Sequence, residues 1–252
     1  MAEGRLTGRT ALITGAGRGF GMNIARRFAR EGARVVVHYN RSGVTAKALA
    51  TELGGLTAQA DVTRWDDVKR MADDLFENLG RVDVLVNNVG DVAPEQATWR
   101  ELREDLVDRV IAVDVKGTLF MCHEFGQRMM EHGGGVIVNV CSNVVVTGSP
   151  RAPQYAASKY GVLGVTKSYA AAFAPSVRVN ALGPGFIATD STLTRRDWTP
   201  EREREIVART PLGKIGDPDE LTGVVLFLAS DDSAHMTGNF VLCDGGFSMV
   251  GA

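Results

Sequence analysis

The residues with the clearest capacity for chemistry are a tyrosine and a lysine that share one face of a predicted helix. Tyr155 and Lys159 lie four positions apart in a segment whose pattern is helical through Phe173, and side chains at this spacing are neighbours on a helix. A free phenol has a pKa of ~10, and lowering it to about 7 requires ~4 kcal/mol. One cation at ~4 Å supplies about that much in a medium of effective dielectric ~20. We therefore interpret Tyr155 as a general acid/base and Lys159 as the cation that lowers its pKa.

A serine strengthens this interpretation, because a lone Tyr-x-x-x-Lys spacing also arises by chance. Ser142 lies 13 residues before Tyr155, at the carboxyl end of an apolar run. Ligands of parallel sheets collect beyond the carboxyl ends of strands, where a hydroxyl can hydrogen-bond a carbonyl and stabilise developing oxyanion charge. The neighbouring Cys141 points the other way in a strand and is expected to be buried.

A glycine-rich loop forms the second constellation. It follows the first apolar run and precedes a helical segment. Glycines let the backbone approach a pyrophosphate, and the helix N-terminus supplies free amides. The strict G-x-G-x-x-G spacing fails, because Phe20 or Met22 stands where it would close, whereas T-G-x-x-x-G-x-G fits. We predict nucleotide binding rather than a flexible turn, at Gly15, Gly17, Arg18, Gly19, Phe20 and Gly21.

The end of the second apolar run indicates which nucleotide is bound. It reads Asn40-Arg41-Ser42, without the acid that would bond the ribose 2′-hydroxyl of NAD. Arg41 and Arg18 could instead grip the 2′-phosphate of NADP, so we predict NADP (NADPH), with NAD possible if these arginines are only solvated charges. Asp61, beside Val62, could accept from the adenine amino group or simply form a solvated turn.

These residues require a scaffold that brings strand ends together. Short runs rich in valine and isoleucine alternate with longer segments of helical period, which is typical of parallel strands joined by crossover helices and covered on both faces. We predict one α/β domain over residues 1–252, a doubly wound parallel seven-stranded sheet (Rossmann fold) with helices on both faces. The strands are expected at residues 10–14, 34–39, 56–60, 82–87, 136–140, 177–182 and 240–243.

Several boundaries carry their own signals. Thr63 is expected to cap an acidic helix start, and Asp217-Pro218 to begin another helix. Residues 102–132 are predicted to form one long helix with a buried apolar face. Residues 183–199 are predicted to be an irregular, mobile lid, with a loose surface loop as the alternative. Within them, Arg195 and Arg196 would contact either an anionic substrate or only water.

Composition narrows the classes of partner. With 28 Lys and Arg against 30 Asp and Glu, we expect no nucleic acid and no membrane as partner, and a small-molecule substrate instead. The three cysteines do not pair in spacing, and the first residues lack a signal-peptide pattern, so a cytoplasmic location is expected. The four histidines have no metal-ligand spacing and are interpreted as ordinary surface or packing residues, so we predict no metal.

Taken together, the motifs resemble the short-chain dehydrogenase/reductase (SDR) family, and most closely its 3-oxoacyl-carrier-protein-reductase-like branch. The resemblance spans essentially the whole chain. It rests on Thr14-Gly15-x-x-x-Gly19-x-Gly21, Asn87-Asn88-Val89-Gly90, Ser142, Tyr155-x-x-x-Lys159, Asn180, Pro184-Gly185, Thr189, Thr237-Gly238 and Asp244-Gly245-Gly246.

The resemblance implies a role for each matching residue. Tyr155 would move the proton, Ser142 would steady the carbonyl, and Lys159 would hold the nicotinamide ribose, so that Tyr155 and Lys159 also contact the cofactor. The remaining cofactor contacts would be Asn88, Val89, Gly90, Pro184, Gly185, Ile187 and Thr189. Relatives of this kind pair long helices, here those ending near His132 and Phe173, so a homotetramer, or a homodimer, is implied.

Two departures from the family pattern bear on the chemistry. The family usually has an asparagine 28 residues before the serine, where it helps hold a water in a proton relay, and this chain has Asp114. We predict that Asp114 takes part in the catalytic centre, and that its charge pairs with Lys159 and weakens the effect of lysine on Tyr155. The usual N-N-A-G is N-N-V-G here, and Val89 adds bulk.

The sequence therefore predicts an NADP(H)-dependent oxidoreductase that interconverts a ketone and a secondary alcohol, with Tyr155 as general acid/base. The ends of the two long helices, Met130-Glu131-His132-Gly133 and Phe173-Ala174-Pro175-Ser176, are not basic. A free ketone or alcohol is favoured over an acidic carrier protein for that reason. The alternatives are a 3-oxoacyl thioester reductase and, in a different class, a catalytically weak nucleotide-binding regulator.

Overall fold

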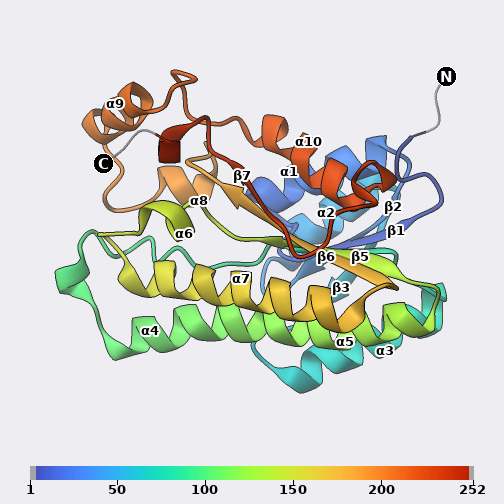
Figure 1. Ribbon diagram of the computed structural model, residues 1–252. Helices are drawn as coiled ribbons and strands as arrows, with labels where there is room; N and C mark the ends of the chain where they lie inside the picture. Colours follow the sequence, from blue (N-terminus) through green and yellow to red (C-terminus); the bar gives the residue numbers. More distant parts are fainter. Residues whose placement is uncertain (1–3, 250–252) are drawn as a thin grey trace.

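The computed structural model describes residues 4–249 (Figure 1). Within them the strands form one seven-stranded sheet in the order β3-β2-β1-β4-β5-β6-β7, and every neighbouring pair is parallel. The predicted fold class is confirmed. The strands are β1 (Thr10–Ile13), β2 (Arg34–Tyr39), β3 (Leu56–Gln59), β4 (Val84–Asn87), β5 (Gly135–Val140), β6 (Val177–Pro184) and β7 (Phe240–Cys243).

Helices cover both faces of the sheet, as Figure 1 shows. One layer contains α1 (Gly19–Arg30), α2 (Gly43–Leu53) and α10 (Pro218–Ala229), and the other contains α3 (Trp65–Leu79), α4 (Glu104–Ile111), α5 (Gly117–Glu131) and α7 (Pro153–Phe173). Short elements complete the fold: η1 (Trp99–Glu101), η2 (Ala112–Lys116), α6 (Val144–Thr147), α8 (Asp190–Leu193), α9 (Pro200–Arg209), η3 (Asp231–Ser233) and η4 (Phe247–Met249).

The central strands are largely apolar because each divides its side chains between two cores. On β1, Ala11 and Ile13 pack with α1, α2 and α10, whereas Leu12 packs with α3 and α5 on the opposite face. This alternation follows from the two-residue period of a strand, and a sheet covered on both faces requires apolar residues at every position. No helix in residues 4–249 is long and apolar enough to cross a bilayer.

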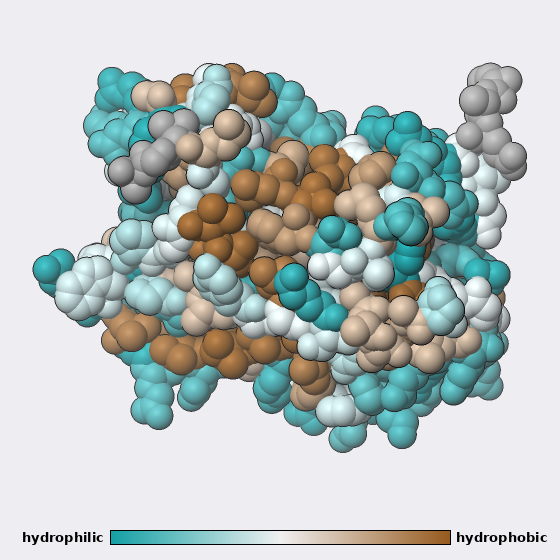
Figure 2. Space-filling view, in the orientation of Figure 1, coloured by the Kyte–Doolittle hydropathy of each residue, from teal (hydrophilic) through white to brown (hydrophobic). Residues whose placement is uncertain are grey.

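The view in Figure 2 shows hydrophobic residues gathering in two regions of the surface, one around β7 and one along the lower edge over α4. Leu242 of β7 is 36% exposed and Leu102, just before α4, is 48% exposed. Surfaces of this kind mark contact sites more often than chance.

Several predicted boundaries need correction. Thr63 does not cap α3: the helix begins after Arg64, and the Thr63 hydroxyl donates to Asp61 Oδ1 at 2.7 Å instead. The long helix predicted at residues 102–132 begins at Glu104 and contains a π-helical turn, η2, between α4 and α5. Residues 183–199 are less irregular than predicted, because β6 continues to Pro184 and α8 follows at Asp190.

The order of the strands places a crevice between β1 and β4, where the chain reverses its direction of winding across the sheet. Ligands of doubly wound sheets bind at this point. Thr14 fixes the two strand ends together, since its hydroxyl accepts from the backbone N–H groups of Asn88 at 2.8 Å and Val89 at 3.0 Å. The glycine loop and the segment after β4 therefore meet at one edge of the sheet.

Candidate active site

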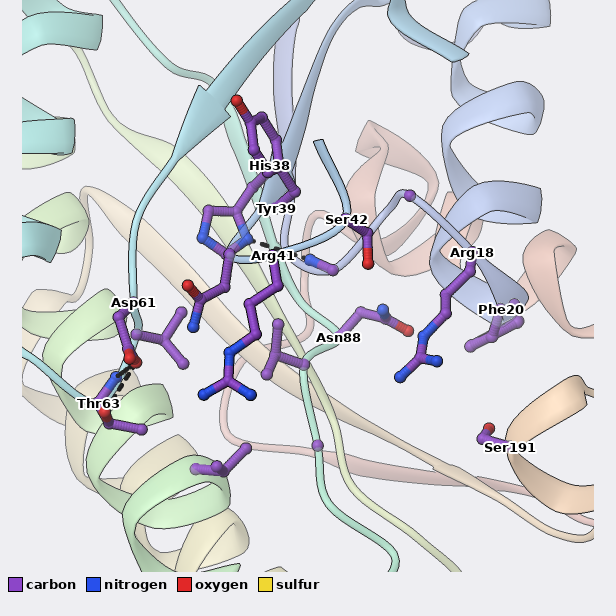
Figure 3. A pocket seen from close by; sticks show the side chains of 18 of the residues that line it. Arg18, Phe20, His38, Tyr39, Arg41, Ser42, Asp61, Thr63, Asn88 and Ser191 are labelled. Carbon is purple, nitrogen blue, oxygen red and sulfur yellow. Dashed lines mark hydrogen bonds between the residues drawn. The ribbon is translucent and has the colours of Figure 1, made fainter. Parts of the chain in front are cut away.

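A cavity of about 350 Å³ opens at this crevice, and its lining includes most of the residues predicted to bind the cofactor. Figure 3 shows their side chains converging on one space from β2, the glycine loop and the segments after β3 and β4. The predicted residues on the wall are Gly15, Gly17, Arg18, Gly19, Phe20, Asn40, Arg41, Ser42, Asp61, Val62, Asn88, Val89 and Gly90. The wall also contains six residues that were not predicted to bind the cofactor: His38, Tyr39, Thr63, Val113, Asp190 and Ser191.

The remaining predicted cofactor residues lie outside this lining. Gly21 is at the packing surface behind the loop, where an added Cβ would lie 2.5 Å from Asn88 Nδ2 and 2.9 Å from the Gly15 carbonyl oxygen. Thr189 lies across the loop, with its Cβ 4.0 Å from a Cβ built at Gly19. Pro184 is the last residue of β6, Gly185 and Ile187 follow it, and Tyr155 and Lys159 belong to α7.

The glycine loop has the backbone that its sequence predicts. Gly15 and Gly19 have φ angles of +64° and +55°, a region that residues with a Cβ rarely occupy. The loop leads into α1, which has no side-chain cap and no acidic residue in its first turn. Its first amides and the positive end of its dipole are therefore available to an anion.

His38 forms the floor of the cavity and holds the glycine loop in place. Its Nδ1 accepts from the Gly15 N–H at 3.1 Å, which assigns the proton to Nε2, 3.1 Å from the Ala60 carbonyl oxygen. Burial lowers the pKa of His38 to about 4, although the bond to Ala60 and the charge of Asp61 raise it. The ring is thus a neutral link between β2, β3 and the loop. The interpretation of His38 as a surface or packing residue agrees with its burial but did not include the bond to the loop, which only its position near the end of β2 could have signalled.

The buried His38 gives the first prediction. The unfolded chain binds a proton near pH ~6.5, whereas the folded chain resists it until about pH 4. Stability is therefore fully present above pH ~6.5 and falls as the pH drops through this window. We expect His38 to make the protein about 2 kcal/mol less stable at pH 5 than at pH 7, measured by urea unfolding.

The contribution of His38 is measured as the difference between wild type and His38→Leu in how steeply the free energy of unfolding changes with pH. His38→Leu removes the titrating ring, so its free energy of unfolding should change less between pH 4 and 6.5. The carboxylates of the chain contribute to both slopes. His235 is exposed, and His235→Gln is the matched control that should keep the wild-type slope. An equal slope in His38→Leu and wild type would contradict the assignment.

Arg18 and Arg41 approach the cavity from opposite sides, as Figure 3 shows, and both are exposed.

Asp61 is held in a turn by Thr63. Its Oδ1 accepts from the Thr63 N–H at 3.0 Å and from the Thr63 hydroxyl at 2.7 Å. Burial raises the pKa of Asp61, but Thr63, Asn40 and Arg41 together bring it below its ordinary value. Asp61 is therefore an ionised acceptor in a turn and also part of the cavity wall, so both sequence interpretations are compatible with its position.

The predicted catalytic residues lie beside one another at the carboxyl end of β5. Ser142 is 7% exposed and follows this strand, and Lys159 Nζ lies 5.5 Å from the centre of the Tyr155 ring. The ammonium donates to the Val140 carbonyl oxygen at 3.3 Å. Cys141 is buried as predicted, and its thiol donates to the Lys159 carbonyl oxygen at 3.2 Å.

Asp114 joins this cluster from η2. Its Oδ2 lies 3.3 Å from Lys159 Nζ and accepts from the Ser158 hydroxyl at 2.7 Å, while Oδ1 accepts from the Asp91 N–H at 2.7 Å. The carboxylate is fully buried. The predicted pairing of Asp114 with Lys159 is confirmed, and the π-helical turn that carries it is a feature often found at functional sites.

The electrostatics of the cluster correct one expectation. Burial raises the pKa of Tyr155, the charge of Lys159 lowers it, Asp114 raises it again, and a hydrogen bond with Ser142 lowers it. The net pKa lies above the ordinary value, so the predicted fall toward neutrality is wrong for the chain alone. Burial is the largest effect on the pKa of Lys159 and lowers it, but Asp114, Tyr155 and Cys141 together raise it above its ordinary value. Lys159 therefore remains charged, with part of its field neutralised by Asp114.

The cluster around Lys159 and the cavity share a wall at Gly90. Gly90 lines the cavity, and a Cβ built on it would lie 3.1 Å from Lys159 Nζ and 3.4 Å from Asp114 Oδ1. A molecule that fills the cavity and extends past Gly90 would thus reach the ammonium. Asn180, by contrast, is structural: its amide donates to the Met236 carbonyl oxygen at 2.8 Å and accepts from the Asn239 N–H at 3.1 Å.

Comparisons with known proteins agree with this arrangement. A family model described as enoyl-(acyl carrier protein) reductase matches residues 15–248. The chain is 40% identical to a 3-oxoacyl-[acyl-carrier-protein] reductase of Thermotoga maritima, over 96% of this chain and 98% of that protein. It is 37% identical to a D-threitol dehydrogenase of Mycolicibacterium smegmatis, over 97% of this chain and 95% of that protein.

A solved structure gives the same result at the level of the fold. A gluconate 5-dehydrogenase from Burkholderia cenocepacia, crystallised with NADP and tartrate, superposes with a TM-score of 0.91 at 31% identity, covering 97% of each chain. The shared motifs, the sheet order and these relatives agree on one family. The chain belongs to the short-chain dehydrogenase/reductase family of oxidoreductases.

Proposed function

We propose that this protein is an NADP(H)-dependent oxidoreductase that interconverts a ketone and a secondary alcohol. The observation that carries the proposal is the shared wall at Gly90, because it sets Lys159 and the Tyr155 helix against the end of the nucleotide cavity. The family binds NAD or NADP, and the glycine loop, the uncapped start of α1 and the two arginines fit a dinucleotide with its phosphates.

In this proposal each side chain of the cluster has a separate role in the reaction. Bound NADPH would supply a hydride to the substrate carbon, and NADP would accept one in the reverse direction. Tyr155 donates its phenolic proton to the carbonyl oxygen during reduction and takes a proton during oxidation. Ser142 donates a hydrogen bond to the same oxygen and stabilises its developing charge. Lys159 holds the nicotinamide ribose and favours the ionised form of Tyr155.

Discrimination for NADP is proposed to come from Arg18 and Arg41. Hydrogen bonds between charged groups contribute about 1.5–3 kcal/mol each, so Arg41→Ala should weaken NADP binding at least about tenfold, and Arg18→Ala should do likewise. NAD lacks the 2′-phosphate, and we expect its affinity to change by less than about threefold. Fluorescence titration of NADPH and NADH measures both.

Arg34 begins β2 at its opposite end and is exposed, so Arg34→Ala is the matched control and should leave both affinities as in wild type. Equal losses for NADPH and NADH in Arg41→Ala would contradict a role in recognising the phosphate. The proposal would also be contradicted if wild type bound NADH more tightly than NADPH.

The substrate is proposed to be a free ketone or alcohol. The names of the relatives include an acyl-carrier-protein reductase and a threitol dehydrogenase, so both thioesters and small alcohols belong in the assay. The test is NADPH oxidation with a panel of ketones and 3-oxoacyl thioesters, beside Tyr155→Phe. Tight cofactor binding with no turnover of any substrate would favour the regulatory alternative. The predicted homotetramer or homodimer, and the cytoplasmic location, stay predictions.

A further inference from the structure

A second group of charged side chains lies at the same end of the sheet as Tyr155. Asp197 pairs with three arginines: Arg195 Nη2 at 2.6 Å, Arg202 Nε at 3.4 Å and Arg151 Nε at 3.6 Å. The side chains of Asp197 and Arg195 are 11% exposed and that of Arg151 is 8% exposed. Three guanidinium groups against one carboxylate leave two positive charges in excess, and Arg196 outside the group pairs with Glu101 instead.

Arg151 places this cluster beside the catalytic helix. It precedes α7, four residues before Tyr155, and its guanidinium donates to the carbonyl oxygens of Val92, Ala93 and Gln96 at 2.6–2.7 Å. The segments that follow β4, β5 and β6 therefore meet at one guanidinium and at Asp197. This is the edge of the sheet where Ser142 and Tyr155 lie, and where a substrate must be held.

The arginines differ in which of their guanidinium N–H groups already bond to acceptors of the protein. Arg151 directs Nη1 and Nη2 to backbone carbonyls, and Arg195 directs Nε and Nη2 to Asp197. Arg202 is 39% exposed, and its buried Nε has no hydrogen-bond partner within residues 4–249. Within residues 4–249, Nη1 of Arg195 and the guanidinium of Arg202 make no hydrogen bond, so these donors are left for a ligand.

The excess positive charge of these arginines is unfavourable when no further anion is bound. Burial and the nearby Arg195 lower the pKa of Arg151 to about 10, while Asp197 and Tyr155 raise it. A buried positive group is stabilised by an opposite charge with matching hydrogen-bond geometry. A second anion at Arg195 and Arg202 would supply it.

We propose that Arg195 and Arg202 bind a carboxylate of the substrate, so that the enzyme acts on oxo acids and their hydroxy acids. The inference rests on the proposed function, since it concerns the substrate of that site. A carboxylate presents two oxygens in the plane that a guanidinium fork matches. Asp197 aligns the arginines, and Arg151 fixes the cluster relative to Tyr155.

Matched pairs of an oxo acid and its methyl ester test the proposal, because they differ in charge at one end only. With NADPH, we expect wild type to have at least about tenfold higher kcat/KM for 4-oxopentanoate, or a homologue one carbon longer or shorter, than for the ester. Arg202→Gln should reduce this acid-to-ester ratio at least about tenfold, and Arg202→Lys should restore part of it. Arg204 is 74% exposed on the same helix, so Arg204→Gln should keep the wild-type ratio.

A binding measurement separates this inference from the proposed reaction. Calorimetric titration of the NADP complex with succinate, at low salt, should give saturable millimolar binding that Arg202→Gln weakens at least fivefold, with no heat from succinamide. An acid-to-ester ratio near one in wild type, or a ratio unchanged in Arg202→Gln, would overturn the carboxylate site even if ketones are reduced. If no ketone is reduced, the proposed function fails, and absent succinate binding would then overturn the site as well.

Discussion

Tyr155→Phe is expected to lower kcat for ketone reduction by about 1,000-fold and to leave the affinity for NADPH within about threefold of wild type. The variant keeps the ring and removes only the hydroxyl, so the substrate oxygen loses its proton donor. General acid/base catalysis typically contributes 10²–10⁴-fold, and 1,000-fold corresponds to ~4 kcal/mol in the activation barrier. Single-turnover kinetics with saturating NADPH measure this loss at the chemical step.

The next tyrosine on the same helix provides the control. Tyr160 is 57% exposed, and its hydroxyl donates to the Val145 carbonyl oxygen at 2.6 Å. Tyr160→Phe therefore removes an equivalent hydroxyl away from the catalytic cluster and should retain kcat within about twofold. A Tyr155→Phe variant that reduces ketones at the wild-type rate would require another proton donor, and the proposed mechanism would be wrong.

Asp114→Asn is expected to have two separable effects. Removing the buried charge lets the full field of Lys159 act on Tyr155, and the charge of Asp114 raises the pKa of that tyrosine. The pKa of Tyr155 should therefore fall in the variant. Alcohol oxidation requires ionised Tyr155, so the rise of kcat/KM with pH should move to lower pH.

The second effect of Asp114→Asn is on stability. The variant leaves a buried ammonium without its carboxylate, and breaking such a pair costs about 3–5 kcal/mol. Urea unfolding at pH 7 measures this loss. Asp108 is exposed on the preceding helix α4, and Asp108→Asn should change neither the pH profile nor the unfolding midpoint. A destabilised Asp114→Asn with an unchanged pH profile would assign to Asp114 a structural role only.

The sequence was sufficient for the sheet and for the positions of the predicted catalytic residues. Most strands are runs of largely apolar residues bounded by loops, and this pattern reflects burial on both faces of the sheet. Tyr155, Lys159 and Ser142 could be placed because helix spacing and strand ends are local properties. The same is true of the glycine loop, whose conformation depends on Gly15 and Gly19 themselves.

The features that sequence reasoning missed depend on contacts between distant segments. His38 is polar and near a strand end, but its role arises only when β2 brings it under Gly15. Thr63 has the residue type of a helix cap, yet it bonds to Asp61 because this acid precedes it in a turn. The π-helical turn at Asp114 and the desolvation of Tyr155 likewise follow from tertiary packing, which no residue spacing reports.

The guanidinium of Arg151 has a consequence for redesign. Enzymes of this architecture invite the exchange of loops between relatives, on the view that each loop is an independent module. Here three carbonyl groups of the loop after β4 accept hydrogen bonds from Arg151, and Asp197 of the loop after β6 forms an ion pair with the same residue. A chimaera that imports one loop alone would leave buried donors or an acid without partners. The loops after β4, β5 and β6 therefore have to be exchanged together, and the exchange has to include Arg151.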